Sequence, residues 1–220
     1  MGAFEKLHLK SLEERRTRLQ KLGQVFFGNG TRFQQTNATA LLSEQEVISD
    51  SAGAEPDIVE INQREGIAEY LFQGDINLTD EQLNRMEKSI TSAESTRSKR
   101  QVAKYAVLWP NKRVYYYFDP GLSARMRTIA QKALNYIQAR TCVSFVHNAT
   151  VLHKVRIVND VGCWSDIGMV GGEQYLSLGS GCDVIGIAAH EFAHTLGVFH
   201  MEMRDDRDAY ITVDLTNVPV

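Results

Sequence analysis

The stretch HEFAHTLGVFH, residues 190–200, constrains the fold of this 220-residue chain more than any other part of it. It contains three of the chain's six histidines. His190 and His194 are four residues apart, so on a helix their imidazoles lie on one face and can reach the same ion. Gly197 can take the left-handed conformation that ends a helix, after which the chain can turn back and bring His200 to that ion. The spacing therefore predicts a zinc site formed by these three histidines.

A hydrolytic site follows from the same stretch. Three neutral imidazoles leave zinc one coordination position for water, and the metal lowers the pKa of that water toward about 7. Glu191, next to the first ligand, can take the proton of the water as a general base. A single histidine elsewhere is more often a surface or satisfied core residue, and we interpret His8, His147 and His153 in that way.

The bulk properties of the chain exclude some classes of partner. A net charge of -3 gives no electrostatic basis for binding nucleic acid, and no apolar run approaches the roughly 20 residues of a membrane span. Residues 1–23 carry charge throughout and lack the apolar centre of a signal peptide.

Other features favour the secretory pathway. The basic run at residues 97–100, RSKR, is typical of a processing site there, and the less favoured alternative is a solvated charge cluster. The sequons make four asparagines candidates for glycosylation: Asn29, Asn37, Asn77 and Asn148. We expect a secreted, extracellular protein whose signal peptide lies upstream of Met1.

The two halves of the chain differ in the elements they predict. Residues 1–100 contain neither Cys nor Trp and look polar and partly helical. Leucines at 7, 12, 19 and 22 predict one surface helix, Thr79 is placed to cap another, and residues 90–100 resemble an exposed linker. Residues 101–220 predict helices over 122–137 and 184–196 and strands over 113–118, 142–146, 155–158 and 174–178.

Several motifs together resemble one known family. Residues 190–200 fit HExxHxxGxxH, the signature of the metzincin zinc proteases. The continuation RDDRDAYI at 204–211 is similar to the astacin branch, whose signature runs on through R-x-D-R-D-x-Y. Upstream, Cys163-Trp164-Ser165, Gly171-Gly172 and LSLGSGC at 176–182 are also astacin-like and stand in the right order. The chain resembles nematode-type astacin zinc metalloendopeptidases over residues 101–220.

The resemblance implies a fold and an activity for residues 101–220. The fold class is α+β, a metzincin-like N-terminal subdomain with a twisted mixed sheet and two long helices, of which the active-site helix carries HExxH. The activity is hydrolysis of peptide bonds in protein or peptide substrates through a water activated by one Zn²⁺ per chain. Glu191 is then the catalytic residue, and His190, His194 and His200 are the metal ligands.

The resemblance also implies a role for residues 1–100. Astacins are made as zymogens whose propeptide carries an F-x-G-D motif, here Phe72-Gln73-Gly74-Asp75. Asp75 would be the metal ligand of the latent state, and the propeptide, mostly helical or irregular, would inhibit its own enzyme. A carboxylate suits zinc, and a glycine before it lets the backbone enter a cleft. Alone, FQGD could be a simple turn. An activating protease would cut between Arg100 and Gln101.

In the family, residues equivalent to Cys163 and Cys182 pair, so the resemblance implies a disulfide between them here. In the family, the cysteine that matches Cys142 pairs with a second cysteine near the end of the catalytic domain. This sequence has no such second cysteine, so the resemblance leaves Cys142 unpaired. The strand at 176–178 would form the sheet edge on which an extended substrate lies by main-chain pairing.

The sequence departs from the family pattern in ways that leave alternatives open. Met201 stands where the family has Glu after the third His, and Val198 where it prefers an aromatic residue. The Met-containing turn and a switchable Tyr ligand would lie beyond Val220. We therefore expect residues 101–220 to be a partial, C-terminally truncated peptidase domain without the Met-turn subdomain. Two alternatives are a non-catalytic zinc-binding isoform or gene-model fragment with little or no activity, and a structural zinc site in which Asp75 supplies the fourth ligand.

Overall fold

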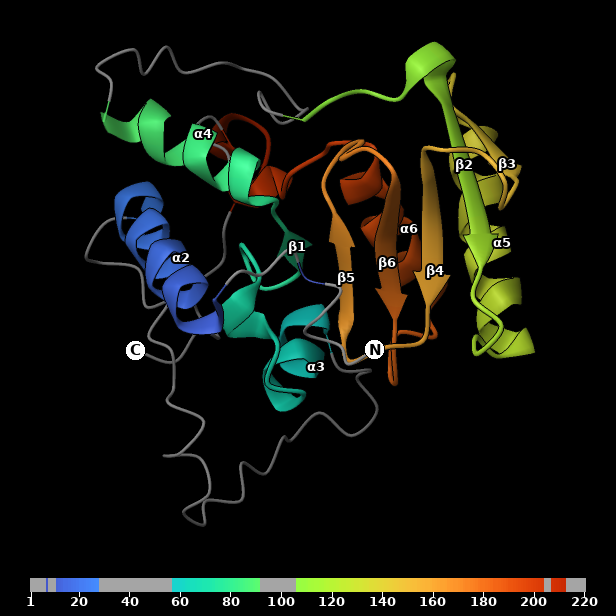
Figure 1. Ribbon diagram of the computed structural model, residues 1–220, viewed down its shortest axis with the longest axis horizontal. Helices are drawn as coiled ribbons and strands as arrows, with labels where there is room; N and C mark the ends of the chain where they lie inside the picture. Colours follow the sequence, from blue (N-terminus) through green and yellow to red (C-terminus); the bar gives the residue numbers. More distant parts are fainter. Residues whose placement is uncertain (1–6, 8–10, 28–56, 92–105, 204–206, 213–220) are drawn as a thin grey trace.

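The computed structural model describes residue 7 and residues 11–27, 57–91, 106–203 and 207–212. Its centre is a six-stranded mixed sheet in the order β1-β5-β6-β4-β2-β3 (Figure 1). The strands are β1 (Ile76–Asn77), β2 (Arg113–Phe118), β3 (Ser144–His147), β4 (Lys154–Val158), β5 (Cys163–Asp166) and β6 (Glu173–Leu178). The α-helices are α2 (Leu12–Phe27), α3 (Ile58–Arg64), α4 (Asp80–Thr91), α5 (Ala124–Gln138) and α6 (Ile185–Thr195). Short 3₁₀ turns lie at Ala68–Tyr70, Pro110–Lys112, Met201–Met203 and Arg207–Ala209.

The strand directions explain why the sheet is mixed. Strand β2 pairs in parallel with β3 and β4, and β4 pairs in parallel with β6. Gly171 and Gly172, with φ of 90° and 66°, reverse the chain between β5 and β6, so these two strands run antiparallel. Strand β1, from the first half of the chain, then pairs in parallel with β5. The α+β prediction with a mixed sheet and two long helices is confirmed.

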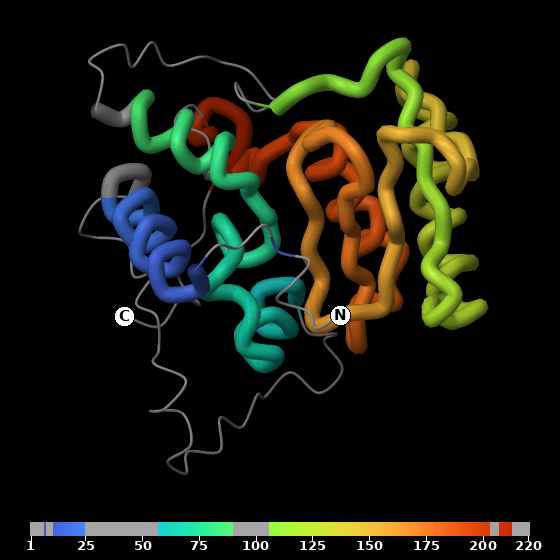
Figure 2. Tube along the Cα trace, in the orientation of Figure 1, coloured from blue at the N-terminus to red at the C-terminus, as the bar shows by residue number. Residues whose placement is uncertain are grey.

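Helices α5 and α6 cover one face of the sheet, and α2, α3 and α4 gather beside its β5 end (Figures 1 and 2). Helix α5 begins where Ser123 accepts a hydrogen bond from the Met126 N–H at 3.1 Å. Its buried residues recur at helical spacing, so one side of α5 faces the sheet. The buried residues of α5, those of α6 and the strand side chains that face these helices form the main core. It includes Ala130, Leu134, Val155, Ile157, Leu176 and Phe192.

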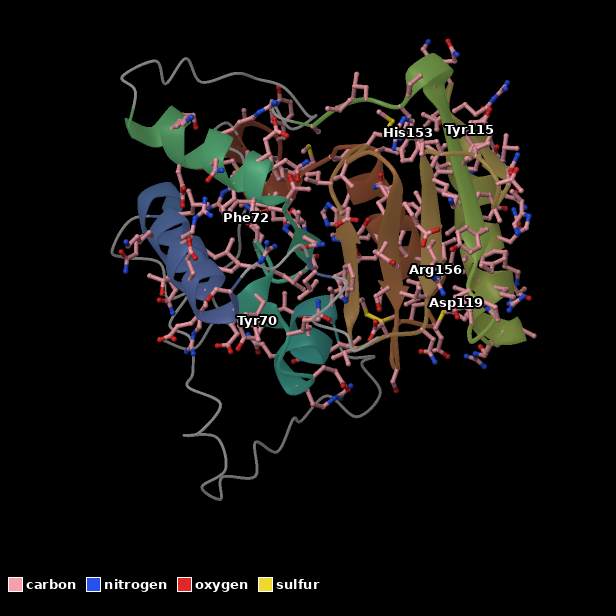
Figure 3. The ribbon with its side chains drawn as sticks, viewed as in Figure 1. Tyr70, Phe72, Tyr115, Asp119, His153 and Arg156 are labelled. Atoms are coloured by element: carbon pink, nitrogen blue, oxygen red, sulfur yellow. A yellow bond between two sulfur atoms is a disulfide. The ribbon has the colours of Figure 1, made fainter. Side chains whose placement is uncertain are left out.

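The other face of the sheet carries charged and aromatic side chains. Arg156 on β4 donates from Nε to Asp119 Oδ2 at 2.8 Å (Figure 3), and the Tyr117 hydroxyl donates to Glu173 at 2.8 Å. Partial burial and the neighbouring Glu173 carboxylate raise the pKa of Tyr117 to about 12. These hydrogen bonds give partners to the polar side chains of Arg156 and Tyr117 on this face of the sheet, which no described helix covers.

The first half of the chain shares two smaller cores with the second. In one, Trp164 of β5 packs with Leu7, Ile67 and Leu71. In the other, Ile167 packs among residues from α2, β1 and its flanking loops, and α4, namely Leu19, Leu22, Phe72, Ile76, Leu78, Leu83 and Met86. The described parts of the two halves are therefore packed together rather than separate. No described helix has the length and apolarity that a bilayer crossing requires.

Several predicted elements are displaced or were missed. The first helix begins at Leu12 rather than Leu7, and Leu7 is buried separately against Trp164. Helix α3 and strands β1 and β5 were not predicted, since they are short. The predicted cap at Thr79 is confirmed: its Oγ1 accepts from the Gln82 N–H at 3.2 Å, and Gln82 Oε1 accepts from the Thr79 N–H at 2.9 Å, a capping box.

The prediction that residues 176–178 form the sheet edge is wrong. They lie in β6, which is bounded by β4 on one side and β5 on the other. The reversal at Gly171 and Gly172 places β6 inside the sheet and leaves β5 as one of the two outer strands of residues 101–220, with β3 at the opposite edge. The outer side of β5 is occupied by β1.

Truncating the main core tests this packing. Leu134 on α5 is completely buried, so Leu134→Ala should lower the free energy of unfolding by about 2–5 kcal/mol. Urea unfolding followed by circular dichroism measures the change. Lys132→Ala, at an exposed position of the same helix, is the control and should change stability little. Equal effects of the two substitutions would contradict the assigned face of α5.

Candidate metal centre

The end of helix α6 positions the histidines. Gly197, with φ of 93°, donates its N–H to the His194 carbonyl at 2.7 Å, and the Val198 N–H donates to the Ala193 carbonyl at 3.0 Å. These two bonds form a Schellman motif, which ends the helix and turns the chain back. The prediction that Gly197 adopts the left-handed conformation is confirmed. The turn brings His200 next to the two histidines of α6.

The structure brings the three histidines together with Asp75 from the first half. Asp75 Oδ2 lies 3.0 Å from Nε2 of His190, 3.0 Å from Nε2 of His200 and 3.6 Å from Nε2 of His194. Nε2 of His190 lies 3.1 Å from that of His200 and 2.9 Å from that of His194. Among the described residues these four form one group whose ligand atoms all lie within 4.8 Å of one another.

The donor set and its spacing fit zinc. With metal–ligand bonds of about 2.0–2.1 Å, a tetrahedral site separates neighbouring ligand atoms by about 3.3–3.4 Å. The His194 Nδ1 lies 2.7 Å from the Val198 carbonyl, which can only accept, so Nδ1 carries the proton and Nε2 presents a lone pair to the cluster. Lone pairs and a carboxylate converging in this way repel one another unless a cation lies between them. We infer that the cluster is built for a metal ion.

The charges of the cluster shift its pKa values. Burial alone would raise the pKa of Asp75, but its contacts with the three histidines outweigh burial and lower it. Burial lowers the pKa of His194, and the contact with Asp75 opposes this only in part. Burial also acts to lower the pKa of His200, but there the hydrogen bond with Asp75 prevails and raises it. Asp75 is thus ionised, as a metal ligand must be.

Glu191 lies at this site without a protein partner. It is completely buried, and neither carboxylate oxygen has a hydrogen bond from any residue that the structure describes. Burial raises the pKa of Glu191 well above its usual value, and the charge of Asp75 adds to the shift. A buried carboxylate without partners is costly, so a native fold retains one for a chemical role more readily than for stability.

A tight turn presents Asp75 to the histidines. Phe72 and Ile76 bond to each other through both pairs of main-chain groups, at 2.8 and 3.0 Å. Between them Gln73 and Gly74 have φ of 56° and 93°. FQGD is therefore a turn that also carries a candidate ligand. An added Cβ at Gly74 would meet only Val59 at 3.9 Å, so Gly74 is required by its backbone conformation and not by a close approach.

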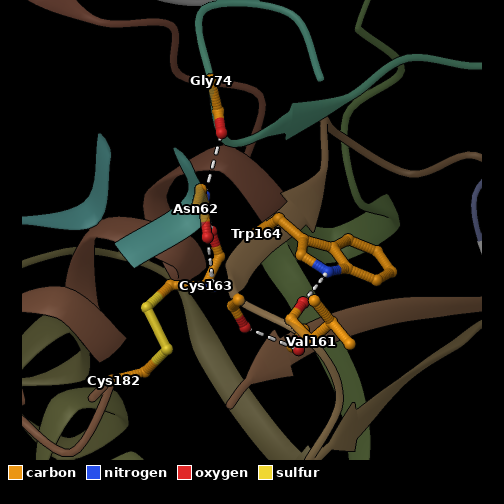
Figure 4. The surroundings of a disulfide bond; sticks show 8 residues. Asn62, Gly74, Val161, Cys163, Trp164 and Cys182 are labelled. Atoms are coloured by element: carbon orange, nitrogen blue, oxygen red, sulfur yellow. Dashed lines mark hydrogen bonds between the residues drawn. A yellow bond between two sulfur atoms is a disulfide. The ribbon is translucent and has the colours of Figure 1, made fainter. Parts of the chain in front are cut away.

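The first half also occupies the outer edge of β5. The Asn62 side chain acts as a strand residue there: its Oδ1 accepts from the Cys163 N–H at 2.8 Å, and its Nδ2 donates to the carbonyls of Cys163 at 2.6 Å and Gly74 at 2.9 Å (Figure 4). The Ser165 N–H donates to the Asp75 carbonyl at 3.1 Å. Main-chain groups of β5 that would otherwise face outward are thus paired.

A buried polar network extends this contact to helix α2. Arg15 is 4% exposed and donates to Asn77 Oδ1 at 2.9 Å, while Asn77 Nδ2 donates to Asp166 Oδ1 at 2.5 Å. Arg15 also donates to the carbonyls of Tyr70 and Leu78, each at 2.7 Å. Burial lowers the pKa of Arg15 to about 10, against the opposing charges of Asp166 and Asp80.

Sequence reasoning missed Asn62, Arg15 and Asp166. Arg15 lies in the charged run EERR, which is typical of a solvated helix face, and nothing local distinguishes it. The glycosylation prediction for Asn77 is wrong for this fold: Asn77 is completely buried and its Nδ2, where a glycan would be attached, is bonded to Asp166.

The remaining predicted residues are distributed as follows. Cys163 and Cys182 form a disulfide (Figure 4), and Cys142 is exposed and free. Asn148 is half-buried with Oδ1 accepting from Thr150, and glycosylation there stays a prediction. Of the histidines interpreted as ordinary, His153 accepts from the Gly172 N–H at 2.9 Å, and His147 packs edge-on against Tyr116. Outside the described residues lie His8, Asn29, Asn37, Arg100 and Gln101.

Comparison with known proteins agrees with this geometry. A family model described as Astacin, a peptidase family, matches residues 101–220. Zinc metalloproteinase nas-32 of Caenorhabditis elegans is 53% identical over 163 residues, which are 74% of this chain and 25% of that protein. Zinc metalloproteinase nas-17 of the same organism is 37% identical over 163 residues, 74% of this chain and 37% of that protein.

A solved structure, high choriolytic enzyme 1, a hatching-enzyme zinc protease from Oryzias latipes, is 29% identical with a TM-score of 0.44 and covers 50% of this chain and 56% of its own. The mixed sheet and the histidine cluster at the end of α6 define a domain of the metzincin type with a candidate zinc site. This chain belongs to the astacin family of zinc metallopeptidases. It spans about a quarter of the length of nas-32 and somewhat more than a third of that of nas-17.

Removal of the metal should destabilise the chain. A ligand that binds only the folded state at about a hundredfold excess over its Kd stabilises by about 2.7 kcal/mol, so chelation should lower the midpoint of thermal unfolding and zinc should restore it. Differential scanning calorimetry with metal analysis measures both. His194→Ala should remove the response, while His153→Ala, outside the cluster, should keep it. An identical response in both variants would contradict the assigned ligands.

The Asn62 contact can be tested separately. Asn62→Ala leaves the N–H and carbonyl of Cys163 without their partner, which should cost about 1–3 kcal/mol. Hydrogen exchange read by mass spectrometry should show faster exchange in the peptide containing Cys163. Gln63→Ala, exposed on the same helix, provides the comparison. Unchanged exchange at Cys163 in Asn62→Ala would rule out this edge contact.

Proposed function

We propose that this chain is the latent form of an astacin-type zinc endopeptidase, with residues 1–100 as propeptide and residues 101–220 carrying the catalytic groups. The observation that supports this most strongly is the position of Asp75. Its carboxylate lies 3.0 Å from Nε2 of both His190 and His200, although it comes from the other half of the chain. In this proposal Asp75 holds the coordination position that a hydrolytic site needs for water.

Each residue of the cluster has a distinct role in the proposed reaction. His190, His194 and His200 would hold the metal, with His194 oriented by the Val198 carbonyl. Zinc bound there would supply Lewis-acid chemistry and lower the pKa of water. Glu191 would accept a proton on its carboxylate and later donate it to the leaving amine. Burial and the raised pKa of Glu191 suit a group that must hold a proton during the reaction.

The outer edge of β5 is the proposed substrate site. Strand β1 pairs there with Ile76 opposite Ser165, and this pairing places Asp75, one residue earlier, among the histidines. A substrate peptide added to the same edge would therefore bring its main chain to the metal centre. In the latent form β1, Asn62 and the Asp75 turn exclude such a peptide.

Activation would then require removal of the first half. Cleavage between Arg100 and Gln101 would separate the segment that contains Asp75 and β1 from the histidines. A secreted protein of this kind would meet its activating protease and its protein or peptide substrates outside the cell. The basic residues at 97–100 support this site of cleavage.

A second candidate is a structural zinc site. Four protein ligands already surround the site, as in closed structural centres. The unpaired buried carboxylate of Glu191 favours the catalytic proposal, because a structural site has no use for it.

Two substitutions test the proposed function. After cleavage at Arg100, Glu191→Gln should lower kcat/KM on a peptide substrate by about 10²- to 10⁴-fold, because it removes the general base. Zinc content should stay at the native value. Asp75→Ala should give low peptidase activity before cleavage, well below that of the cut chain, because it frees a coordination position while β1 and Asn62 still cover the edge of β5. Fluorogenic peptide hydrolysis and metal analysis are the measurements.

Glu65→Ala, an exposed acid of the same half, is the control for Asp75→Ala and should leave the uncut chain latent. A native chain that binds zinc but hydrolyses no peptide after cleavage would favour the structural site instead.

A further inference from the structure

Helix α2 carries a buried cation at a position where its spacing predicts an apolar residue. Arg15, Leu19 and Leu22 are buried and recur at intervals of four and three residues, so they lie on one face of the helix. The two leucines pack in the core that contains Phe72 and Ile76. A cation at such a position is costly unless its N–H groups find acceptors, so the acceptors of Arg15 indicate its role.

The guanidinium of Arg15 joins the two arms of the turn that carries Asp75. Its Nε donates to the Tyr70 carbonyl at 2.7 Å, which lies before the turn. Its Nη1 donates to the Leu78 carbonyl at 2.7 Å and its Nη2 to Asn77 Oδ1 at 2.9 Å, and both of these acceptors lie after the turn. The three acceptors therefore enclose residues 71–76, and Asp75 lies among them.

The main chain alone gives this turn little support. The ladder between β1 and β5 is only two residues long, Ile76–Asn77. Arg15 adds three hydrogen bonds from a charged donor, and such bonds are stronger than neutral ones. Burial lowers the pKa of Arg15 only to about 10, so the charge is present at neutral pH. Because a guanidinium presents its donors in a rigid planar fork, it also fixes the distance between the two arms.

We propose that Arg15 is a positioning residue for latency: by bridging Tyr70 and Leu78 it keeps the carboxylate of Asp75 at the three histidines. The proposal rests on the proposed latent form, in which Asp75 is a metal ligand. Arg15 does not touch the histidines and acts only through the turn. Without the bridge the arms separate more readily, and Asp75 leaves the metal in a larger fraction of uncut chains.

Binding of a small zinc ligand to the uncut, zinc-loaded chain tests the bridge. Acetohydroxamate needs an open coordination position, so its apparent Kd falls as the fraction of chains with Asp75 displaced rises. Met has a long unbranched side chain without donors, so Arg15→Met removes the three hydrogen bonds and should lower this Kd by about tenfold. Isothermal titration calorimetry measures the Kd.

Arg18→Met is the matched control. Arg18 lies on the same helix and also makes three side-chain hydrogen bonds, but its acceptors are Glu87 and Asn84 on α4. Its loss removes as many bonds without freeing the arms of the turn, so the Kd should stay at the native value.

A double substitution separates positioning from a general structural effect. Asp75→Ala opens the coordination position directly and should give the tightest binding of acetohydroxamate. Adding Arg15→Met to Asp75→Ala should change the Kd no further, because Arg15 acts only through Asp75. A loss of structure around the histidines would change the Kd in both backgrounds.

A native Kd in Arg15→Met, or an equal fall in Arg18→Met, would overturn the role of Arg15 and leave Asp75 as the ligand. If Asp75→Ala binds acetohydroxamate no more tightly than the native chain, the proposed latent form fails, and the role of Arg15 fails with it. Should Arg15→Met not fold, Arg15→Lys takes its place. Lys keeps the charge, but its donors share one nitrogen and cannot bridge the arms, so the Kd should fall as well. A native Kd in Arg15→Lys would overturn the bridge.

Discussion

The convergence of Asp75 with three histidines from residues 190–200 is the constraint on which the rest of the described structure depends. Lone pairs and a carboxylate at separations of 2.9–3.6 Å repel one another unless a cation binds them, so the surrounding packing must hold them there until it does. On one side the Schellman turn at Gly197 and the Val198 carbonyl fix the direction of His194 and His200. On the other side the Phe72–Ile76 turn fixes Asp75. Both turns depend on a glycine with positive φ, Gly197 in one and Gly74 in the other. Each turn directs its ligand side chains toward the same metal position.

Strand β5 connects the metal centre to the rest of the fold. Its inner side pairs with β6 and so belongs to the sheet that α5 and α6 cover. Its outer side pairs with β1, and its ends are held by Asn62 at Cys163 and by Gln82, whose Nε2 donates to the Ile167 carbonyl at 2.9 Å. An unpaired edge strand is a site at which any extended chain can add. In the described structure the chain covers this edge with its own first half, and the same coverage places a carboxylate at the histidines.

The sequence predicted the parts of this arrangement that depend on local spacing. The HExxHxxGxxH stretch places ligands on one helix and its turn, and the structure has both; the amphipathic pattern of 122–137 likewise corresponds to α5. The sequence could not predict which strand lies at the edge, because that depends on the reversal at Gly171 and Gly172 and on pairing between distant residues. Nor could it predict Arg15, Asn62 and Asp166, since each of them has a partner 55 to 101 residues away. Asn77 shows how a local motif misleads: its sequon favours a glycan, while tertiary packing buries its amide.

In the proposed latent form, cleavage after Arg100 would not break the contacts between the first half and β5 directly. It would lower the effective concentration of the first half at β5. Each hydrogen bond described between the first half and residues 163–167 comes from residues 62–82, and a cut between Arg100 and Gln101 would break none of them. Before the cut, the contact between the first half and β5 is intramolecular. After the cut, the same contact joins two separate chains, which can dissociate on dilution. Water can replace the hydrogen bonds of Asn62, Asn77 and Gln82 at small net cost, whereas the two cores around Trp164 and Ile167 are apolar. The polar part of this contact can be lost once the tether is cut, whereas the two apolar cores oppose the release of the first half.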